Sequence, residues 1–179
     1  VDVVVATHPH NDHIGGLVDD DGKLNYRNAK YMMERAEWDH WMAEEVLAAM
    51  DPNRAAFFKS KLLPIKDKLT LFDGETEIAP GINTVPMPGH TPGHTGIRLE
   101  SNGERLLHMV DTAHMIAQIS HPHWSPKFDN DPEHAEKTRR AVFAQAAEEN
   151  ILVMDFHFEF PAMGYIVADG DAWKWQPVV

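Results

Sequence analysis

The stretch from Thr7 to Gly16, which reads THPHNDHIGG, restricts the fold of this chain more than any other part of its sequence. It directly follows an apolar run over residues 1–6, which predicts a buried strand. A strand that ends in a dense group of metal-competent side chains is typical of a metal-binding loop. The side chains concerned are His8, His10, Asp12 and His13.

One loop cannot complete a metal site, so further ligands are expected downstream. Candidates occur where strand-like apolar runs meet loops, which is where rigid scaffolds usually place chemistry. Imidazole and carboxylate together suit divalent ions such as Zn, Mn, Co or Fe(II). Ordinary surface or core histidines are the alternative, but histidine seldom clusters so densely without a metal. The downstream candidates are His90, His94, Asp111 and His157.

This order of motifs resembles the metallo-β-lactamase superfamily, and the resemblance covers most of the chain. It implies two divalent metal ions, Zn first, with Mn, Co or Fe as alternatives. By that resemblance, the first ion would be held by His8, His10 and His90, the second by Asp12, His13 and His157, and Asp111 would bridge them.

Three positions refine the resemblance. Position 10 is His, where the redox di-iron branch of the superfamily has Glu. Position 111 is Asp, where the best-known dizinc β-lactamases have Cys, and this difference favours other hydrolases. Val110 stands before Asp111, at a place where the family commonly has Gly.

The fold class that the resemblance implies is α/β (α+β), an αββα sandwich of two facing sheets. A length of 179 residues suits one buried core, so a single domain over residues 1–179 is expected. Family members place several strands before the motif that begins here at His8, so the first sheet is expected to be incomplete in this chain. Either an upstream segment or another chain would complete that sheet.

Composition excludes several classes of partner. The net charge of −12 and the lack of a basic run argue against nucleic acid. No apolar run approaches the length of about 20 residues that a membrane span requires. The absence of cysteine excludes disulfides and thiolate ligands, but it does not identify a compartment. A homo-oligomer is left open.

The first half of the chain predicts a strand over residues 29–33, a helix from Glu34 to Met50, and a second helix that begins at Asp51-Pro52. Trp38, Trp41, Met42, Val46 and Ala49 give the first of these helices an apolar face. Trp38, Trp41, Phe57 and Phe58 are expected either to pack in the core or to form an apolar wall of a substrate pocket.

The second half predicts strands and tight turns, and the segments 71–74, 76–79 and 82–86 fit the start of a second sheet. A hairpin over 95–110, turned at Asn102-Gly103, should bring His90 and Asp111 to the same end of that sheet. The long segment 111–131 is expected to be a functional loop. A helix from Asp131 to about Asn150, a buried strand over 151–155 and a closing hairpin with packed Trp173 and Trp175 should follow.

Two ions about 3.5 to 4 Å apart can share a water and lower its pKa from about 16 to about 7, which makes hydrolysis the default reaction. Asp12 could also accept the proton of the nucleophile. His94 is expected to orient a ligand or to bond backbone rather than to bind metal. Lactone-cleaving relatives often carry Tyr three residues after the bridging Asp; His114 occupies that offset and could donate to an oxyanion, or could face solvent without a role.

Three segments resemble most closely the branch of methyl parathion hydrolase and the quorum-quenching lactonases: residues 71–74, 77–82 and 157–165. That branch implies small, neutral, partly apolar esters, lactones or phosphotriesters as substrates. The expected function is metal-dependent hydrolysis of a lactone or ester. The alternatives are phosphotriester hydrolysis, a β-lactamase, and a metal-binding fragment without activity.

Overall fold

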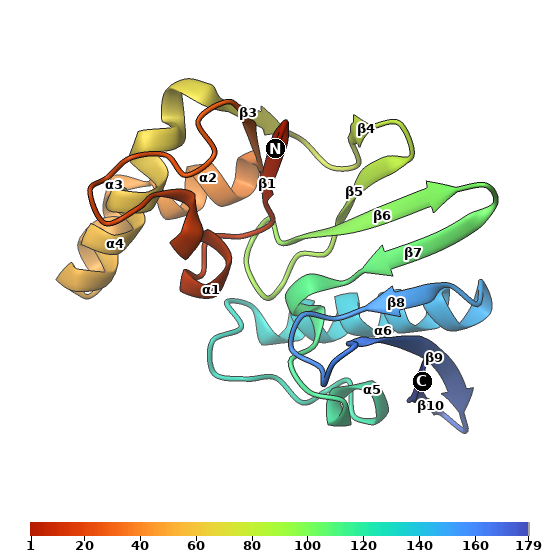
Figure 1. The fold of residues 1–179 in the computed structure, drawn as a ribbon. Coiled ribbons are helices and arrows are strands. Elements are labelled where there is room, and N and C mark those ends of the chain that lie inside the picture. The colour runs from red at the N-terminus through yellow and green to blue at the C-terminus, as the bar shows by residue number, and fades with distance from the viewer. Residues whose placement is uncertain (179) are drawn as a thin grey trace. The chain divides into compact units, whose positions relative to one another are not determined.

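The computed structural model describes residues 1–178 and divides the chain into two compact units. We call Val1–Asp73 unit 1 and the chain from Gly74 onward unit 2. Each unit is built around its own sheet (Figure 1). The single domain over residues 1–179 stays a prediction, and its last residue, Val179, lies outside the described residues.

Unit 1 contains a parallel sheet of three strands in the order β1-β2-β3. The strands are β1 (Val3–Ala6), β2 (Lys30–Glu34) and β3 (Leu69–Phe72). The prediction that β3 belongs to the second sheet was wrong, because Leu71 pairs with Met33 of β2 in parallel register. Leu69 and Leu71 pack against the unit 1 core, and this burial accounts for the placement.

The helices of unit 1 are α1 (Asn11–Ile14), α2 (Arg35–Trp41), α3 (Glu44–Ala49) and α4 (Pro52–Leu62), with short 3-10 turns at Gly15–Leu17 and Leu63–Lys68. The single helix predicted from Glu34 to Met50 is wrong, because Ala43 adopts an extended backbone that ends one helix and begins the next. The break turns Ala49 outward, whereas Leu47 packs against the core.

The four aromatic side chains of unit 1 that the sequence singled out pack in its core, in agreement with one of the two predicted roles. Trp41 and Phe58 are buried, and their rings stack at 5.0 Å between centroids. Trp38 and Phe57 are partly buried against the same cluster. Asp51 caps α4 as predicted, because its side chain accepts hydrogen bonds from two backbone N–H groups of the first turn.

Unit 2 contains a seven-stranded mixed sheet in the order β10-β9-β8-β7-β6-β5-β4. All neighbours are antiparallel except β7 and β8, which are parallel and connected through the long helix α6 (Pro132–Glu148). The strands are β4 (Glu77–Ala79), β5 (Ile82–Pro86), β6 (Thr95–Ser101), β7 (Glu104–His108), β8 (Leu152–Met154), β9 (Met163–Asp169) and β10 (Ala172–Pro177). The predicted α/β class with two sheets is confirmed.

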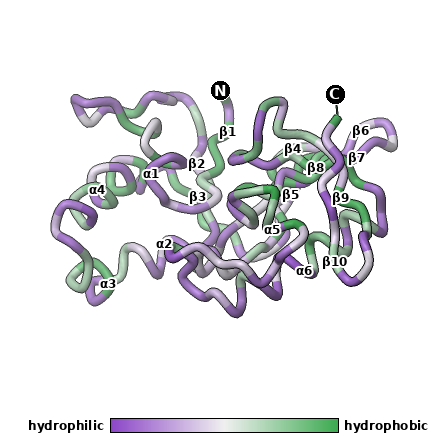
Figure 2. The backbone as a smooth tube through the Cα atoms, turned by 90° about the horizontal axis from the view of Figure 1, so that it is seen from below, coloured by the Kyte–Doolittle hydropathy of each residue, from purple (hydrophilic) through white to green (hydrophobic). Residues whose placement is uncertain are grey.

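Helix α6 forms the core of unit 2 together with this sheet. Its Val142, Phe143 and Ala146 are buried. Trp173 packs against Phe143, with ring centroids 5.9 Å apart, so this part of the closing hairpin supplies packing residues. Within residues 1–178, no helix combines the length and the apolar character that crossing a membrane requires. Figure 2 accordingly shows short hydrophobic stretches between hydrophilic ones.

Candidate metal centre

The candidate ligands of unit 1 follow β1 directly: His8 and His10 lie on the loop after the strand, and Asp12 and His13 lie in the short helix α1. His8 follows the strand and is fully buried, whereas His10 precedes the first turn of α1, and its carbonyl accepts the N–H groups of His13 and Ile14. The His8 ring lies 4.8 Å from the His10 ring and 4.0 Å from the His13 ring between centroids. The Asp12 carboxylate lies 3.5 Å from Nε2 of His13. Unit 1 therefore gathers all four of its predicted ligands.

The candidate ligands of unit 2 converge on one carboxylate oxygen. Three imidazole Nε2 atoms lie near Oδ2 of Asp111, at 3.4 Å for His90, 3.2 Å for His114 and 3.3 Å for His157. The Asp111 side chain is only 3% exposed. A buried carboxylate surrounded by imidazoles is a donor set that divalent ions such as Zn²⁺ take, so the residues of unit 2 fit a metal.

Strand ends bring these side chains together. His90 follows β5, Asp111 follows β7, and His157 follows β8. Because β6 is antiparallel to both β5 and β7, and β8 is parallel to β7, the carboxyl ends of β5, β7 and β8 lie at the same end of the sheet. The predicted proximity of His90 and Asp111 is therefore observed in the structure.

Val110 adopts a left-handed backbone immediately before Asp111. Its φ is +50°, which a β-branched side chain rarely adopts. The family commonly has Gly at this position, and Gly takes this conformation without steric cost. Val110 is buried, and the strain at this turn is of order 1–3 kcal/mol. The strained backbone at Val110 therefore forms the turn that directs Asp111 into the imidazole cluster.

His94 holds the backbone of Asp111 and is not one of the imidazoles around the Asp111 carboxylate. Its Nδ1 lies 2.9 Å from the carbonyl oxygen of Met87, and its Nε2 accepts the backbone N–H of Asp111 at 3.1 Å. Both ring nitrogens therefore bond backbone, as the sequence analysis expected for this residue. The fully buried imidazole fixes the turn that carries the candidate bridging carboxylate.

Asp129 and Arg139 are two functional candidates that sequence reasoning missed. Oδ1 of Asp129 lies 2.9 Å from Nδ1 of His90, and Oδ2 lies 3.2 Å from a guanidinium nitrogen of Arg139. Burial alone would raise the pKa of Asp129, but the hydrogen bond with His90 and the charge of Arg139 outweigh burial and lower that pKa. Neither residue belongs to a recognisable motif, so only the buried ion pair itself identifies them.

Asp155 is a third candidate that the sequence did not reveal. Its Oδ1 accepts the backbone N–H of His157 at 2.9 Å, so it shapes the turn that presents this imidazole. Burial raises the pKa of Asp155 well above its usual value, the hydrogen bond from His157 opposes this shift, and the nearby Asp111 adds to it. Its Oδ2 atom has no hydrogen-bond partner within residues 1–178.

The segment 111–131, predicted as a functional loop, contains a 3-10 turn and the short helix α5 (Ala117–Ser120). The buried Gln118 orders it: its Oε1 accepts the backbone N–H of His114 at 2.7 Å, and its Nε2 donates to the carbonyl oxygen of Trp124. The half-exposed Phe128 ring lies 4.7 Å from the His114 ring. His114 therefore lies within the imidazole cluster, not in a solvent-facing position.

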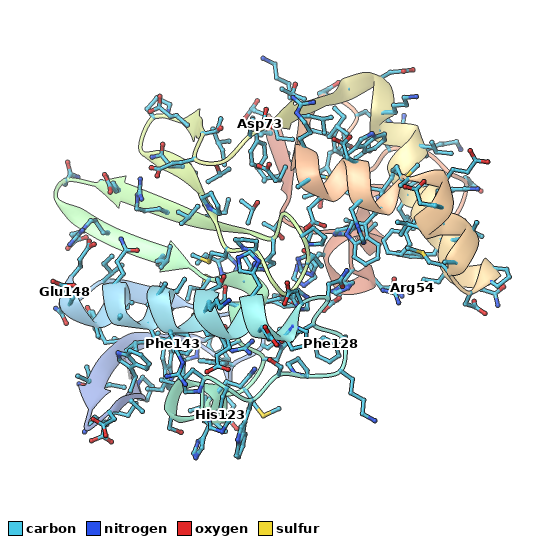
Figure 3. All side chains as sticks on the ribbon, turned by 180° about the vertical axis from the view of Figure 1, so that it is seen from behind. Arg54, Asp73, His123, Phe128, Phe143 and Glu148 are labelled. Carbon is cyan, nitrogen blue, oxygen red and sulfur yellow. The ribbon has the colours of Figure 1, made fainter. Side chains whose placement is uncertain are left out.

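Figure 3 shows Phe128 near the N-terminal end of α6 and His123 projecting outward from unit 2. His121 and His123 are exposed, and both rings lie near Trp124. Neither residue takes part in the cluster around Asp111.

Comparisons with known proteins agree with this arrangement. The sequence profile described as "Metallo-beta-lactamase superfamily" matches residues 1–154. An N-acyl homoserine lactonase of Bacillus cereus is 28% identical over 104 residues, which are 58% of this chain and 35% of that protein. The lactonase AiiA of Bacillus thuringiensis subsp. kurstaki is 28% identical over 106 residues, 58% of this chain and 36% of that protein.

Solved structures of similar fold span the whole chain. AidC, a dizinc quorum-quenching lactonase solved with a product N-hexanoyl-homoserine, has a TM-score of 0.87 and 26% identity. The hydrolase AbOPH has a TM-score of 0.88 and 26% identity. Both comparisons cover 100% of this chain and 65% of the other. With a family profile matched over most of its length, this chain belongs to the metallo-β-lactamase superfamily.

Proposed function

We propose that this protein is a metal-dependent hydrolase that uses two divalent ions, with Zn²⁺ as the first choice. The observation that most strongly supports this proposal is that three imidazole Nε2 atoms lie around Oδ2 of the buried Asp111. Family membership supports the same assignment, because a dizinc lactonase shares the fold. The proposed ligands are His8, His10, Asp12 and His13 from unit 1 and His90, Asp111 and His157 from unit 2.

When bound, the two ions would polarise the scissile carbonyl and lower the pKa of a water molecule. Asp12 is the proposed proton acceptor, since its half-exposed carboxylate can reach solvent while it lies beside His13. His114 is the proposed donor to the oxyanion that forms on the substrate. Its backbone N–H is held by Gln118, and this contact limits the movement of the imidazole.

The proposed substrate is a small neutral lactone or ester that carries an apolar group. Phe128 lies against His114 and Phe156 lies 4.9 Å from the His157 ring, and both side chains are about half exposed. Such apolar surface beside a polar cluster suits an acyl chain and keeps water away from the reacting carbonyl. The relatives named N-acyl homoserine lactonases support this class of substrate.

A hydrolysis screen of the metal-reconstituted protein tests this proposal. We expect turnover of an acyl-homoserine lactone or an aryl ester to exceed turnover of a phosphotriester and of a β-lactam. Asp111→Asn should lower metal affinity and turnover by more than about 100-fold, the upper end of what outer partners of metal ligands cost. Asp73→Asn is the matched control, because Asp73 is an exposed carboxylate that pairs with Arg35. Undiminished turnover in Asp111→Asn would overturn the proposal.

A further inference from the structure

Arg139 is a fully buried cation on α6 that the proposed chemistry does not use. One guanidinium nitrogen lies 3.2 Å from Oδ2 of Asp129, and Nε donates to the carbonyl oxygen of Pro122 at 2.7 Å. A third nitrogen donates to the hydroxyl of Ser125. A buried charge is costly unless it is paired and hydrogen-bonded, and all three contacts are made by the segment that follows Asp111.

The second oxygen of Asp129 reaches His90. Its Oδ1 lies 2.9 Å from Nδ1 of the imidazole, and the two side chains are 0% and 2% exposed. The backbone on either side of the carboxylate strengthens the contact, because Asn130 donates to the carbonyl oxygen of His90 and Asp131 donates to that of Gly89, both at 3.0 Å. The segment 129–131 therefore holds the loop of His90 through both side chain and backbone.

The protonation pattern of these groups follows from their chemistry. A guanidinium only donates hydrogen bonds, so the carboxylate of Asp129 faces it as an ionised acceptor. The same carboxylate can then only accept from His90, and Nδ1 of the imidazole must carry the proton. A neutral imidazole has one N–H, so Nε2 keeps its lone pair. That lone pair belongs to the atom that lies 3.4 Å from Oδ2 of Asp111.

We propose that Asp129 and Arg139 are positioning residues that hold His90 in its Nδ1–H tautomer and so keep Nε2 ready to bind a metal ion. The inference rests on the proposed ligand role of His90. Outer partners of this kind fix both the ring orientation and the tautomer of metal-binding histidines. Arg139 acts through Asp129, because its charge keeps the buried carboxylate in the accepting form.

Another arrangement of the same residues is less favourable. His90, His114 and Asp129 offer ligand atoms within 4.8 Å of one another, so a cation could in principle sit among them. The guanidinium of Arg139 lies 3.2 Å from that carboxylate and is itself fully buried. A second positive charge at this place would be repelled in surroundings that screen it poorly. The geometry therefore favours an arginine-supported hydrogen bond over a further metal site.

Nitrogen NMR of the histidine rings tests the proposal on metal-free, ¹⁵N-labelled protein at about pH 8, where an ordinary imidazole is neutral. We expect His90 of the unaltered protein to show the Nδ1–H tautomer. In Asp129→Asn, the amide oxygen must face Arg139, because that residue only donates, and the amide NH₂ then faces Nδ1. The tautomer should therefore reverse to Nε2–H, and Zn²⁺ affinity in a chelator competition should fall by about 10- to 100-fold.

Two further variants isolate the effect. Arg139→Lys keeps a positive charge but cannot reproduce the planar fork, so we expect the Nδ1–H tautomer to persist and Zn²⁺ affinity to fall less than in Asp129→Asn. Glu149→Gln is the matched control, because Glu149 also pairs with an arginine, Arg105, but follows the far end of α6. It should change neither the His90 spectrum nor Zn²⁺ affinity.

The Nε2–H tautomer in the unaltered protein would overturn the proposal without any variant, so the test does not depend on whether Asp129→Asn folds. Unchanged Zn²⁺ affinity in a folded Asp129→Asn protein would overturn it as well. The expected tautomers together with a failed hydrolysis screen would instead refute the proposed function and leave the positioning role of Asp129 and Arg139 intact.

Discussion

Unit 1 and unit 2 present their candidate ligands in different ways. In unit 1, four ligands lie within six consecutive residues, and the carboxylate of Asp12 is 48% exposed. In unit 2, the ligands come from three separate strand ends, and the carboxylate of Asp111 is 3% exposed. A short stretch of sequence therefore specifies the ligand set of unit 1, whereas the sheet assembles that of unit 2.

Each candidate ligand segment of unit 2 is held by a buried side chain outside the ligand set. Asp129 bonds the ring of His90, and the ring of His94 bonds the backbone N–H of Asp111. Asp155, two residues away in sequence, bonds the backbone N–H of His157. A discontinuous ligand set needs such partners because strand ends alone do not fix the direction of a side chain to the accuracy that a metal requires. We therefore expect stability and metal affinity to be strongly coupled in unit 2.

The largest expected effect comes from breaking this buried network at Arg139. Arg139→Met leaves the carboxylate of Asp129 buried without its cation, and we expect the free energy of unfolding to fall by about 3–5 kcal/mol. Arg140→Met is the matched control, because Arg140 is the next residue on the same helix and makes an exposed i,i+4 pair with Glu136. Its cost should stay near 0.5 kcal/mol, within the range of about 0.3–0.5 kcal/mol for such pairs. Urea unfolding of the metal-free protein measures both, and equal losses would mean that the buried network of unit 2 contributes no more than a surface pair.

Backbone strain also distinguishes the two units. Within residues 1–178, all non-glycine residues with positive φ lie in unit 2, and Val110 directly precedes the candidate bridging ligand. Val110→Ala removes the two buried γ methyl groups and keeps Cβ, whereas Val110→Gly removes Cβ as well, so only glycine relieves the left-handed backbone. We therefore expect the glycine variant to be more stable than the alanine variant by about 1 kcal/mol.

Ala113 supplies the control for this strain. It is buried three residues further on, in extended backbone at φ −135°, so Ala113→Gly should lower stability by about 0.5–1 kcal/mol. Thermal unfolding of the three variants gives the sign of each step. An alanine variant at position 110 that is as stable as the glycine variant would show that the turn before Asp111 stores no strain.

The same contrast explains what the sequence could predict. The candidate ligands of unit 1 could be recognised because they are close together in sequence, and His90, Asp111 and His157 could be recognised because each follows an apolar run. Asp129 and Arg139 gave no such signal, because a buried ion pair depends on which distant segments meet. Arg139 lies among charged residues on α6, and sequence alone offers no reason to bury it while its neighbour Arg140 stays exposed.

The fold, like the site, was predictable only in part. The resemblance implied the α/β class and the two sheets, and periodicity and turn residues predicted the long helix α6 and the closing hairpin. The break between α2 and α3 was missed because no Gly or Pro marks it, and the pairing of β3 with β2 was missed because register is a tertiary property. The same limit applies to α5, which is ordered by the buried Gln118 rather than by a local pattern.

The smallest effect is expected at the exposed ion pairs, which test whether the two units also differ in their surface charges. Arg105 pairs with Glu149 in unit 2, and Arg35 pairs with Asp73 in unit 1. The pKa of Glu149 is lowered by its hydrogen bond with Gln145, against the effect of burial, and further by Arg105. A lowered pKa means that this stabilisation is complete above the ordinary value of 4.5 and is lost as the pH falls through the folded-state pKa.

Glu149→Gln should therefore reduce stability near pH 7 by about 0.2–1 kcal/mol and flatten its decline below pH 4.5. Asp73→Asn should give no larger change, because Asp73 is more exposed and because its pairing raises the pKa of Arg35, a group that is charged throughout the measured range. Urea midpoints between about pH 3 and pH 7 measure both. A large loss in only one of the two variants would show that the units differ in their surface charges as well as in the partners that hold the candidate metal ligands.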